Sequence, residues 1–246
     1  MKRILLVFFL LLFAGKCFSQ QFSQYNTGTL YDSFENPSQK SFITDSSKKY
    51  AFNLFVPNLN ASFYLTGDAQ STLVQRAFGA KYSNAPLQIG SGNYNIGNIN
   101  ANAYSVMFKM FTSLNGDVET GISFNTKAEG KGYFTDESIA LFNGLGAFPN
   151  NTYDNLFNDH FYYQIYNAIG FSYREKINKQ IAFGFKISAL MGIDYNKLNI
   201  DESHVNFDQT TNSATISLKG KYYQSKGPGN FDTRSFFPTS RSPGAA

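Results

Sequence analysis

Two long stretches of alternating side chains constrain the fold of this chain more than any other feature. Over residues 161–174, and again over 181–196, apolar side chains recur at every second position and small or polar ones fill the positions between. A period of two residues is that of a β-strand, whose successive side chains point to opposite faces. The link between them, Glu175 to Gln180, is short and polar. The pattern predicts an antiparallel hairpin with one apolar face and one small, polar face.

The same alternation recurs in residues 103–112, 117–127 and 214–223. Residues 50–66 can hold one or two more strands, and Pro57 limits that segment to a sheet edge, a bulge or a break. Several predicted strands are ten to sixteen residues long. Strands of globular proteins average about five or six residues, whereas a tilted membrane strand needs about 9–11. Strand length therefore favours strands that cross a membrane.

The composition supports a sheet with one apolar face and one wet face. Aromatic residues make up 17% of the chain, charged residues only 15%, and the mean hydropathy is −0.28. A soluble β-sandwich solvates its outer face with charges, but here the face opposite the apolar one carries Gly, Ala, Ser and Asn, which suits a barrel interior. Tyr and Phe near the strand ends suit the aromatic girdles at a membrane surface.

We therefore expect an all-β chain, an antiparallel transmembrane β-barrel with about six to eight strands within residues 50–225. A soluble periplasmic or secreted β-sandwich is the alternative. Residues 226–246 are expected to be an irregular tail, although Ser242-Pro243-Gly244 is typical of the entry to another strand. We accordingly expect an incomplete, amino-terminal portion of a barrel that forms a curved meander sheet, with a truncation point in the tail. The alternative is a complete small barrel with a disordered tail.

The connections suggest one helix and several loops. The Gly/Asn-rich residues 90–100 and the polar residues 201–213 are predicted to be loops. The run Thr135-Asp136-Glu137-Ser138 is an N-cap signature, which predicts a short helix that ends near Gly144 or Gly146.

Alternating connection lengths set the expected topology, because such barrels have short periplasmic turns and long external loops. The turn at 175–180 would then face the periplasm. The loops at 128–160 and 197–213 would lie outside the cell.

The amino terminus has the pattern of a secretory signal peptide, residues 1–19. Lys2-Arg3 is followed by an apolar run, Ile4 to Ala14, and small side chains stand at Cys17 and Ser19 if cleavage precedes Gln20. A lipoprotein signal is disfavoured because a lysine precedes Cys17. After Gln20 no apolar run approaches the 18 residues of a membrane helix. We expect export to the bacterial outer membrane.

Removal of that peptide also removes the one cysteine, Cys17, and three positive charges, so the formal charge falls from +4 to +1. The mature chain would form no disulfide, and its charge argues against binding to nucleic acid. Residues 20–49 are polar and aperiodic, which suits a plug or a periplasmic lead-in.

Short motifs resemble a family of Bacteroidetes outer-membrane proteins known only as a domain of unknown function. They are Gln21 to Asn26 with Tyr25, Thr29-Leu30-Tyr31, Asn36-Pro37-Ser38, Phe55-Val56-Pro57 and Ser242-Pro243-Gly244. The resemblance implies longer relatives and therefore a truncated chain. The layout is more distantly similar to the outer-membrane long-chain fatty-acid transporter family, in which Ser38 would replace an alanine. Neither resemblance implies catalytic residues.

The chemistry-bearing residues give little sign of an enzyme, a cofactor or a metal site. Asp159-His160 lies at a loop–strand junction, and no Gly-x-Ser-x-Gly motif occurs. Asp201, Glu202 and His204 could bind a divalent ion, but solvated loop charge is the expected role. We therefore predict no catalytic, cofactor or metal residues.

Charged side chains on the inferred inward faces are the candidate lumen residues. They could bias a lumen toward anions, or pair with inward acids such as Glu119 and Asp194. The set is Lys127, Arg174, Lys186, Asp194, Lys219 and Lys221.

Two classes of function follow. The first is transport, as a porin or a hydrophobic-solute transporter, with outer-membrane lipid around it and a small or hydrophobic solute as cargo. The second is a non-transporting scaffold, adhesin or secretion-system component with a protein partner that the sequence does not identify.

Overall fold

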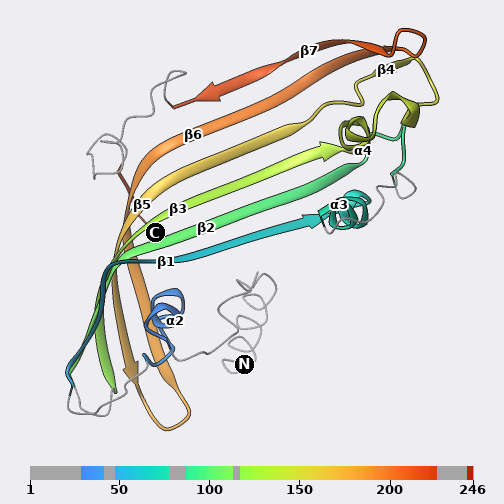
Figure 1. Cartoon of the computed structure of the whole chain (residues 1–246). Coiled ribbons are helices and arrows are strands. Elements are labelled where there is room, and N and C mark those ends of the chain that lie inside the picture. The colour runs from blue at the N-terminus through green and yellow to red at the C-terminus, as the bar shows by residue number, and fades with distance from the viewer. Residues whose placement is uncertain (1–28, 42–47, 78–86, 113–116, 226–242, 246) are drawn as a thin grey trace, which may run out of the picture. The chain divides into compact units, whose positions relative to one another are not determined.

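The computed structural model of the chain describes residues 29–41, 48–77, 87–112, 117–225 and 243–245. Eight strands form one sheet in the hydrogen-bonded order β1-β2-β3-β5-β6-β4, and β7 and β8 also pair with β6 (Figure 1). The strands are β1 (Tyr50–Thr66), β2 (Tyr94–Phe111), β3 (Val118–Thr135), β4 (Thr152–Asp154), β5 (His160–Lys176), β6 (Ala182–Asp208), β7 (Ser213–Gln224) and β8 (Pro243–Ala245). The predicted all-β class is confirmed. Among the described residues the sheet is not closed, so the barrel stays a prediction.

The helices are short. They are α2 (Leu30–Glu35), α3 (Ala69–Ala77) and α4 (Asp136–Ala140), with the 3₁₀ turns η2 (Leu141–Asn143) and η3 (Leu145–Ala147) after α4. None of the helices in the described ranges is both long and apolar enough to span a membrane. The predicted helix after Thr135 is confirmed, and the Thr135 side chain accepts a hydrogen bond from the Ser138 backbone N–H as its N-cap. The predicted signal peptide lies outside the described residues.

The chain divides into two compact units. Unit 1 draws its described residues from Met1–Leu54, Val106–Ser123 and Gly170–Ile187. Unit 2 draws them from Phe55–Ser105, Phe124–Ile169 and Ser188–Ala246.

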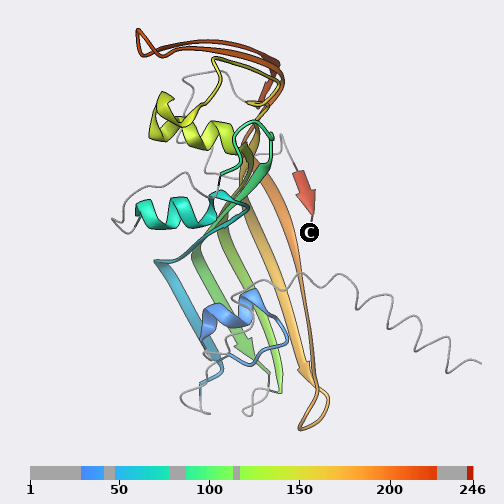
Figure 2. The same ribbon diagram turned by 90° about the vertical axis from the view of Figure 1, so that its right-hand side faces the viewer.

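Unit 1 has a strand region with opposite chemistry on its two faces. On β3, Glu119 and Ser123 are buried and Ile122 is exposed, and on β5, Arg174 is buried and Phe171 is exposed. These strands follow the predicted alternation. The helix α2 lies beside them (Figures 1 and 2). The covered face is therefore polar, and the uncovered face is apolar.

The turn between β5 and β6 also belongs to unit 1, and it confirms the predicted hairpin link. The Ile177 N–H donates to the Ile181 carbonyl oxygen at 3.0 Å. The Asn178 side-chain oxygen accepts the backbone N–H groups of Gln180 and Ile181, each at 2.8 Å. Such an Asx turn closes the hairpin locally.

Unit 2 has an apolar core formed largely by the segments between strands. The Phe148 ring packs against those of Tyr153, Phe157 and Phe207, with ring centroids 4.5–6.1 Å apart. The buried members of this core are Ala69, Leu87, Ile139, Ala140, Phe148, Tyr153, Phe157, Val205 and Phe207.

In unit 2, two buried acids of α4 accept hydrogen bonds from the backbone of a neighbouring loop. Asp136 accepts the Gln88 backbone N–H at 2.8 Å, and Glu137 accepts those of Gly90 and Gly92 at 2.7 and 3.1 Å. The connection between β3 and β5 is therefore an ordered part of unit 2.

Two predicted loops are partly strands. β2 already begins at Tyr94, inside the Gly/Asn-rich segment, and β6 continues to Asp208. The far end of β6 lies between β4 and β7, with Asn206 opposite Thr152 on one side and Thr215 on the other. Ladder pairing on both edges outweighs the weak strand preference of these polar residues.

The side-chain alternation of β2 also differs from the prediction. Tyr104 was expected on an apolar face with Val106, Phe108 and Met110, yet Tyr104 is fully buried and Met110 is exposed. The burial pattern shifts by one position between Tyr104 and Met107. Such a shift is what an extra residue in a strand produces.

The edge strand β1 accounts for its proline. β1 is one continuous strand at the end of the sheet order, where the missing N–H of Pro57 is tolerated. Two residues earlier, Phe55 has a positive φ of 60°. Of the three placements predicted for Pro57, the structure shows the sheet edge.

Within unit 2, β7 and β8 pair with different stretches of β6. β7 pairs with Asn196–Asp208 of β6, and β8 pairs with Ala189–Met191. β8 thus lies within the tail predicted to be irregular, at the Pro243-Gly244 expected to lead into another strand.

Candidate functional site

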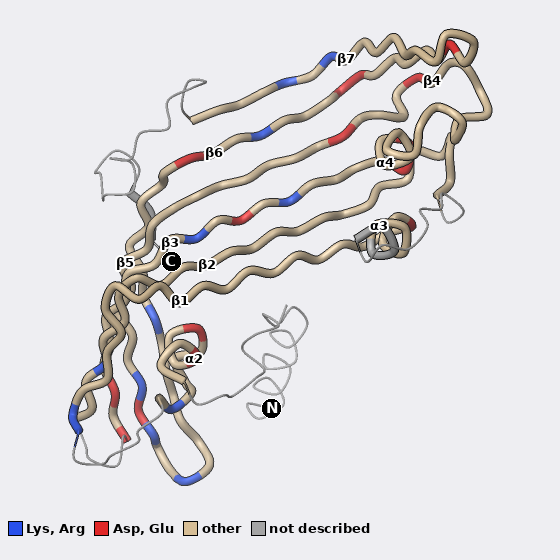
Figure 3. Tube along the Cα trace, in the orientation of Figure 1, with Lys and Arg blue, Asp and Glu red and all other residues tan. Residues whose placement is uncertain are grey.

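The candidate site is a cluster of buried charges on the covered face of unit 1. The Glu119 carboxylate lies 3.2 Å from the Lys109 Nζ and 3.3 Å from the Arg174 Nη1. The three side chains are 0%, 2% and 6% exposed, respectively. They come from β3, β2 and β5, which are adjacent in the sheet. Figure 3 shows charges of both signs on the strands of unit 1, beside α2.

Residues 29–41, here called the docked segment, cover this cluster. Thr29 and Asp32 form a reciprocal capping box that starts α2. The helix ends at Glu35, before Asn36-Pro37, because the residue before a proline disfavours helical geometry. The Asn36 side chain then accepts the Ser38 N–H at 3.2 Å.

Carbonyl oxygens of the docked segment face the cations. The Ser33 oxygen accepts from the Lys109 Nζ at 3.2 Å, and the Phe34 oxygen accepts from the Lys186 Nζ at 3.3 Å. These carbonyls belong to the last turn of α2, at the negative end of its helix dipole. The Ser38 oxygen accepts from the Arg174 Nε at 2.9 Å. Three cationic side chains thus bind three backbone oxygens.

Ser41 fastens the other end of the docked segment to Glu119. Its N–H donates to the carboxylate at 3.3 Å and its hydroxyl at 2.9 Å. Together with Lys109 and Arg174, these donors compensate a carboxylate that would otherwise be costly to bury.

Phe34 is the apolar anchor of the docked segment. Its side chain is fully buried, and its ring centroid lies 5.2 Å from the Lys109 Nζ, within cation–π range. Gly121 makes room for this ring, because a Cβ there would stand 3.0 Å from the Phe34 Cζ. At Gly184, a Cβ would stand only 2.3 Å from the Pro37 carbonyl oxygen. Two glycines therefore allow the docked segment to approach the strands closely.

Only part of the predicted lumen set meets at this site. Arg174 and Lys186 both contact the docked segment, and Arg174 has the pairing with Glu119 that was one of the two expectations. Asp194 lies in unit 2, where it accepts hydrogen bonds from the Tyr163 and Ser225 hydroxyls.

The remaining predicted lysines are elsewhere. Lys219 makes an exposed ion pair with Glu202 at 2.7 Å, Lys221 is exposed on β7, and Lys127 is half-buried on β3.

Sequence reasoning missed Lys109 and the acceptors of the docked segment. Lys109 lies on the small, polar face predicted for 103–112. A lysine on that face was the one sequence feature that could have identified it as a site residue. The acceptors of Ser33, Phe34 and Ser38 are backbone oxygens, which no side-chain pattern reveals.

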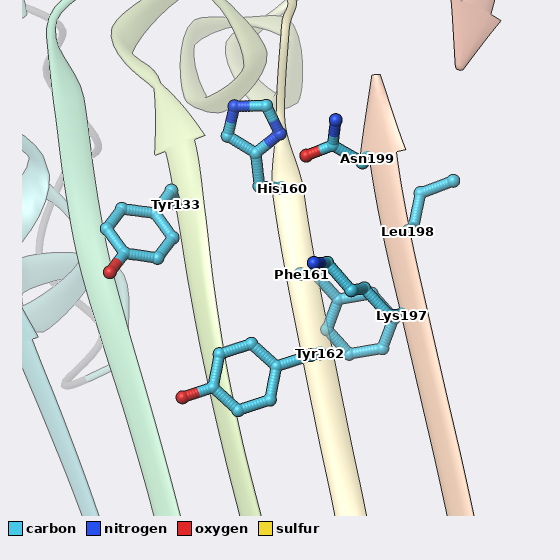
Figure 4. Close-up of a pocket in the computed structure, with 7 residues that line it drawn as sticks. All are labelled: Tyr133, His160, Phe161, Tyr162, Lys197, Leu198 and Asn199. Atoms are coloured by element: carbon cyan, nitrogen blue, oxygen red, sulfur yellow. The ribbon is translucent and has the colours of Figure 1, made fainter. Parts of the chain in front are cut away.

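The two histidines, His160 and His204, lie in unit 2. Asp159 accepts the Thr135 N–H at 2.9 Å, while His160 stacks on Tyr94 with ring centroids 5.8 Å apart. His160 lines an open cavity of about 270 Å³ in unit 2, with side chains from β3, β5 and β6 around it (Figure 4). The ring Nδ1 of His204 hydrogen-bonds to Asp154, and both side chains are exposed. Within the described ranges, no three His, Cys, Asp or Glu residues are placed to hold a metal ion.

A family model matches most of the chain. The model of a family of unknown function, DUF5723, matches residues 41–244. No curated protein and no solved structure matches the chain.

Proposed function

The chain belongs to the DUF5723 family of unknown function, and we propose that it is a bacterial outer-membrane protein whose strands form the wall of a solute passage. The observation that carries this proposal is the inverted burial of unit 1. Large apolar side chains are exposed on one face, and Lys109, Glu119 and Arg174 are buried on the other.

The exposed face of unit 1 has the chemistry of a lipid contact. Phe183 and Ile187 on β6 are 56% and 60% exposed, and Ile122 on β3 is 54% exposed. A soluble sandwich would bury such side chains and solvate the charges, whereas a membrane barrel does the reverse. Outer-membrane lipid is therefore the proposed partner of this face.

The docked segment favours a barrel that transports a solute over a barrel that does not. It covers the charged face with contacts from Ser33, Phe34, Ser38 and Ser41. In this proposal the docked segment is the plug anticipated within residues 20–49. The signal peptide, the Bacteroidetes source and the similarity to fatty-acid transporters stay predictions beside it.

A second role is favoured by the ordered core of unit 2. The connections between strands pack around Phe148 and are fastened by Asp136 and Glu137. A structured external surface of this kind suits a scaffold or adhesin that binds a protein. Cross-linking that recovered one defined partner, without a solute-uptake defect in a deletion strain, would favour this second role.

Membrane placement can be tested with a matched pair of lysine substitutions. Ile187→Lys puts a charge on the proposed lipid face and should cost about 2–4 kcal/mol if it lies near the bilayer midplane. Asn151→Lys adds the same charge at an exposed position of unit 2. We expect Ile187→Lys, but not Asn151→Lys, to reduce the amount of folded, heat-modifiable protein in the outer-membrane fraction. A folded chain in the soluble fraction would contradict the proposal.

A further inference from the structure

We propose that the docked segment occupies the place of the solute, and that the site beneath it binds an oxyanion joined to an apolar, ring-sized group. A carboxylate or a phosphate supplies this shared chemistry. The inference rests on the proposed function, and it names the class of solute that the passage would admit.

The charges of the site define the anionic part. Lys109, Arg174 and Lys186 are three cationic side chains that meet the docked segment, and Lys109 and Arg174 share the Glu119 carboxylate. Each of the three cations donates to a backbone oxygen of the docked segment. When the docked segment withdraws, each cation loses that backbone acceptor. An oxyanion restores the acceptors through charge-assisted hydrogen bonds.

The position of Phe34 defines the apolar part. Its buried ring lies against Gly121 and over the Lys109 ammonium, next to the carbonyl oxygens that Lys109 and Lys186 bind. The docked segment therefore presents an aromatic ring beside partial negative charge. A solute with a ring and a carboxylate would satisfy the same surfaces, and benzoate is the smallest such probe.

Withdrawal of the docked segment can be followed with a cysteine at a buried position. Ser33 is 0% exposed, so Ser33→Cys should resist maleimide in intact outer membranes. The same cysteine in a Phe34→Ala background should react about tenfold faster or more, because Phe34→Ala removes the buried anchor. The chain without Ser33→Cys, whose one cysteine is Cys17, is the labelling control. Unchanged labelling in Phe34→Ala, Ser41→Ala and their combination would show a fixed docked segment and overturn the inference.

Charge selectivity then tests the solute class. Reversal potentials of the released Phe34→Ala chain in planar bilayers should favour benzoate over benzyltrimethylammonium, which has the same ring and the opposite charge. Adding Lys186→Gln should lower this preference. A released chain that conducts neither ion, or prefers the cation, would overturn the inference while leaving membrane placement intact. A chain that never enters the outer membrane would instead overturn the proposed function.

Benzoate and phosphate distinguish the two parts of the proposed solute. A cysteine placed on a strand of unit 1, such as Ser172→Cys, should become reactive when Phe34→Ala releases the docked segment. Benzoate should slow its reaction with maleimide at a lower concentration than inorganic phosphate does. Equal protection by both would limit the site to simple anions and overturn the apolar part.

Discussion

The Glu119 carboxylate accepts hydrogen bonds from two neighbouring strands, β2 and β5, and from the docked segment. Lys109 and Arg174 neutralise it, and Ser41 adds two hydrogen bonds. A buried ion pair contributes little net stability when it is intact, but removal of one partner leaves the others charged and desolvated. Glu119 should therefore be much less tolerant of substitution than an exposed acid in the same sheet.

We expect Glu119→Ala to lower the free energy of unfolding by about 3–5 kcal/mol, because two buried cations lose their counter-charge. Chemical unfolding of the purified chain, followed by circular dichroism, measures this loss. Glu202→Ala is the matched control, since its pair with Lys219 is largely exposed, and it should cost about 0–1 kcal/mol. Similar losses for the two variants would contradict a buried charge cluster.

Asp208 provides a residue-scale prediction of pH dependence at the β6–β7 turn, which is in the predicted external loop. Hydrogen bonds from the side chains of Thr210 and Thr211, and then from their backbone N–H groups, lower the pKa of Asp208 from 3.8 to about 2. The pKa of Asp208 is lower in the folded chain than in the unfolded chain. The ionised Asp208 carboxylate therefore stabilises the turn fully above its ordinary pKa, and this stabilisation is lost as the pH falls through about 2.

We expect the carboxyl resonance of Asp208 to titrate near pH 2 in the folded chain. Thr210→Ala should move this titration toward the ordinary pKa, since it removes the first of those hydrogen bonds. Thr210→Ser keeps the hydroxyl and should retain the low pKa. A titration near the ordinary value in the unsubstituted chain would rule out this turn geometry.

The hairpin of β5 and β6 is closed by one side chain. Asn178 accepts two backbone N–H groups, each worth about 0.5–1.5 kcal/mol net in the general case. Asn178→Ala should therefore speed hydrogen exchange at Gln180 and Ile181 by about fivefold or more, as a loss of about 1 kcal/mol implies.

Asn178→Asp keeps an oxygen acceptor and should exchange almost as slowly as the unsubstituted chain. Lys179→Ala, in the same turn, serves as a second control because its side chain is exposed. Equal acceleration in all three variants would show that the turn is held by other contacts.

At the scale of elements, the sequence predicted strands better than it predicted their ends. The alternation at 117–127 and 161–174 reports burial on one face, so those strands and most of their faces could be read directly. The extensions of β2 to Tyr94 and of β6 to Asp208 depend on pairing with neighbouring strands. The side-chain pattern of a polar segment does not indicate whether it pairs with a strand distant in the sequence.

The candidate site was only partly predictable for a similar reason. Inward-facing Arg174 and Lys186 stand out as charges in otherwise small, polar strand faces. The docked segment has no periodicity, and its contacts with those cations are made by backbone oxygens. Which segment covers a polar sheet face is decided by tertiary structure.

For the molecule as a whole, the proposed placement predicts two opposite patterns of reagent access. Cysteines at Phe171 and Phe183, on the exposed apolar face, should react with lipid-soluble probes and resist water-soluble ones in intact membranes. Cysteines at Ser123 and Ser172, on the covered polar face, should not react with the lipid-soluble probe. Reaction of Phe171→Cys and Phe183→Cys with water-soluble maleimide at the rate of a free thiol would contradict a lipid-facing surface.

The docked segment also sets an order of events in folding. Its contacts join residues 76 to 152 positions apart in the chain, from Ser33–Lys109 to Phe34–Lys186. Contacts at such separations form only after long stretches of chain have closed, and their entropy cost grows with the length closed. The docked segment precedes every strand in the sequence, yet its site is incomplete until Lys186 has taken its place beside β5. The docked segment is therefore synthesised before the strands but binds after them. Its binding indicates that the strands of unit 1 have assembled.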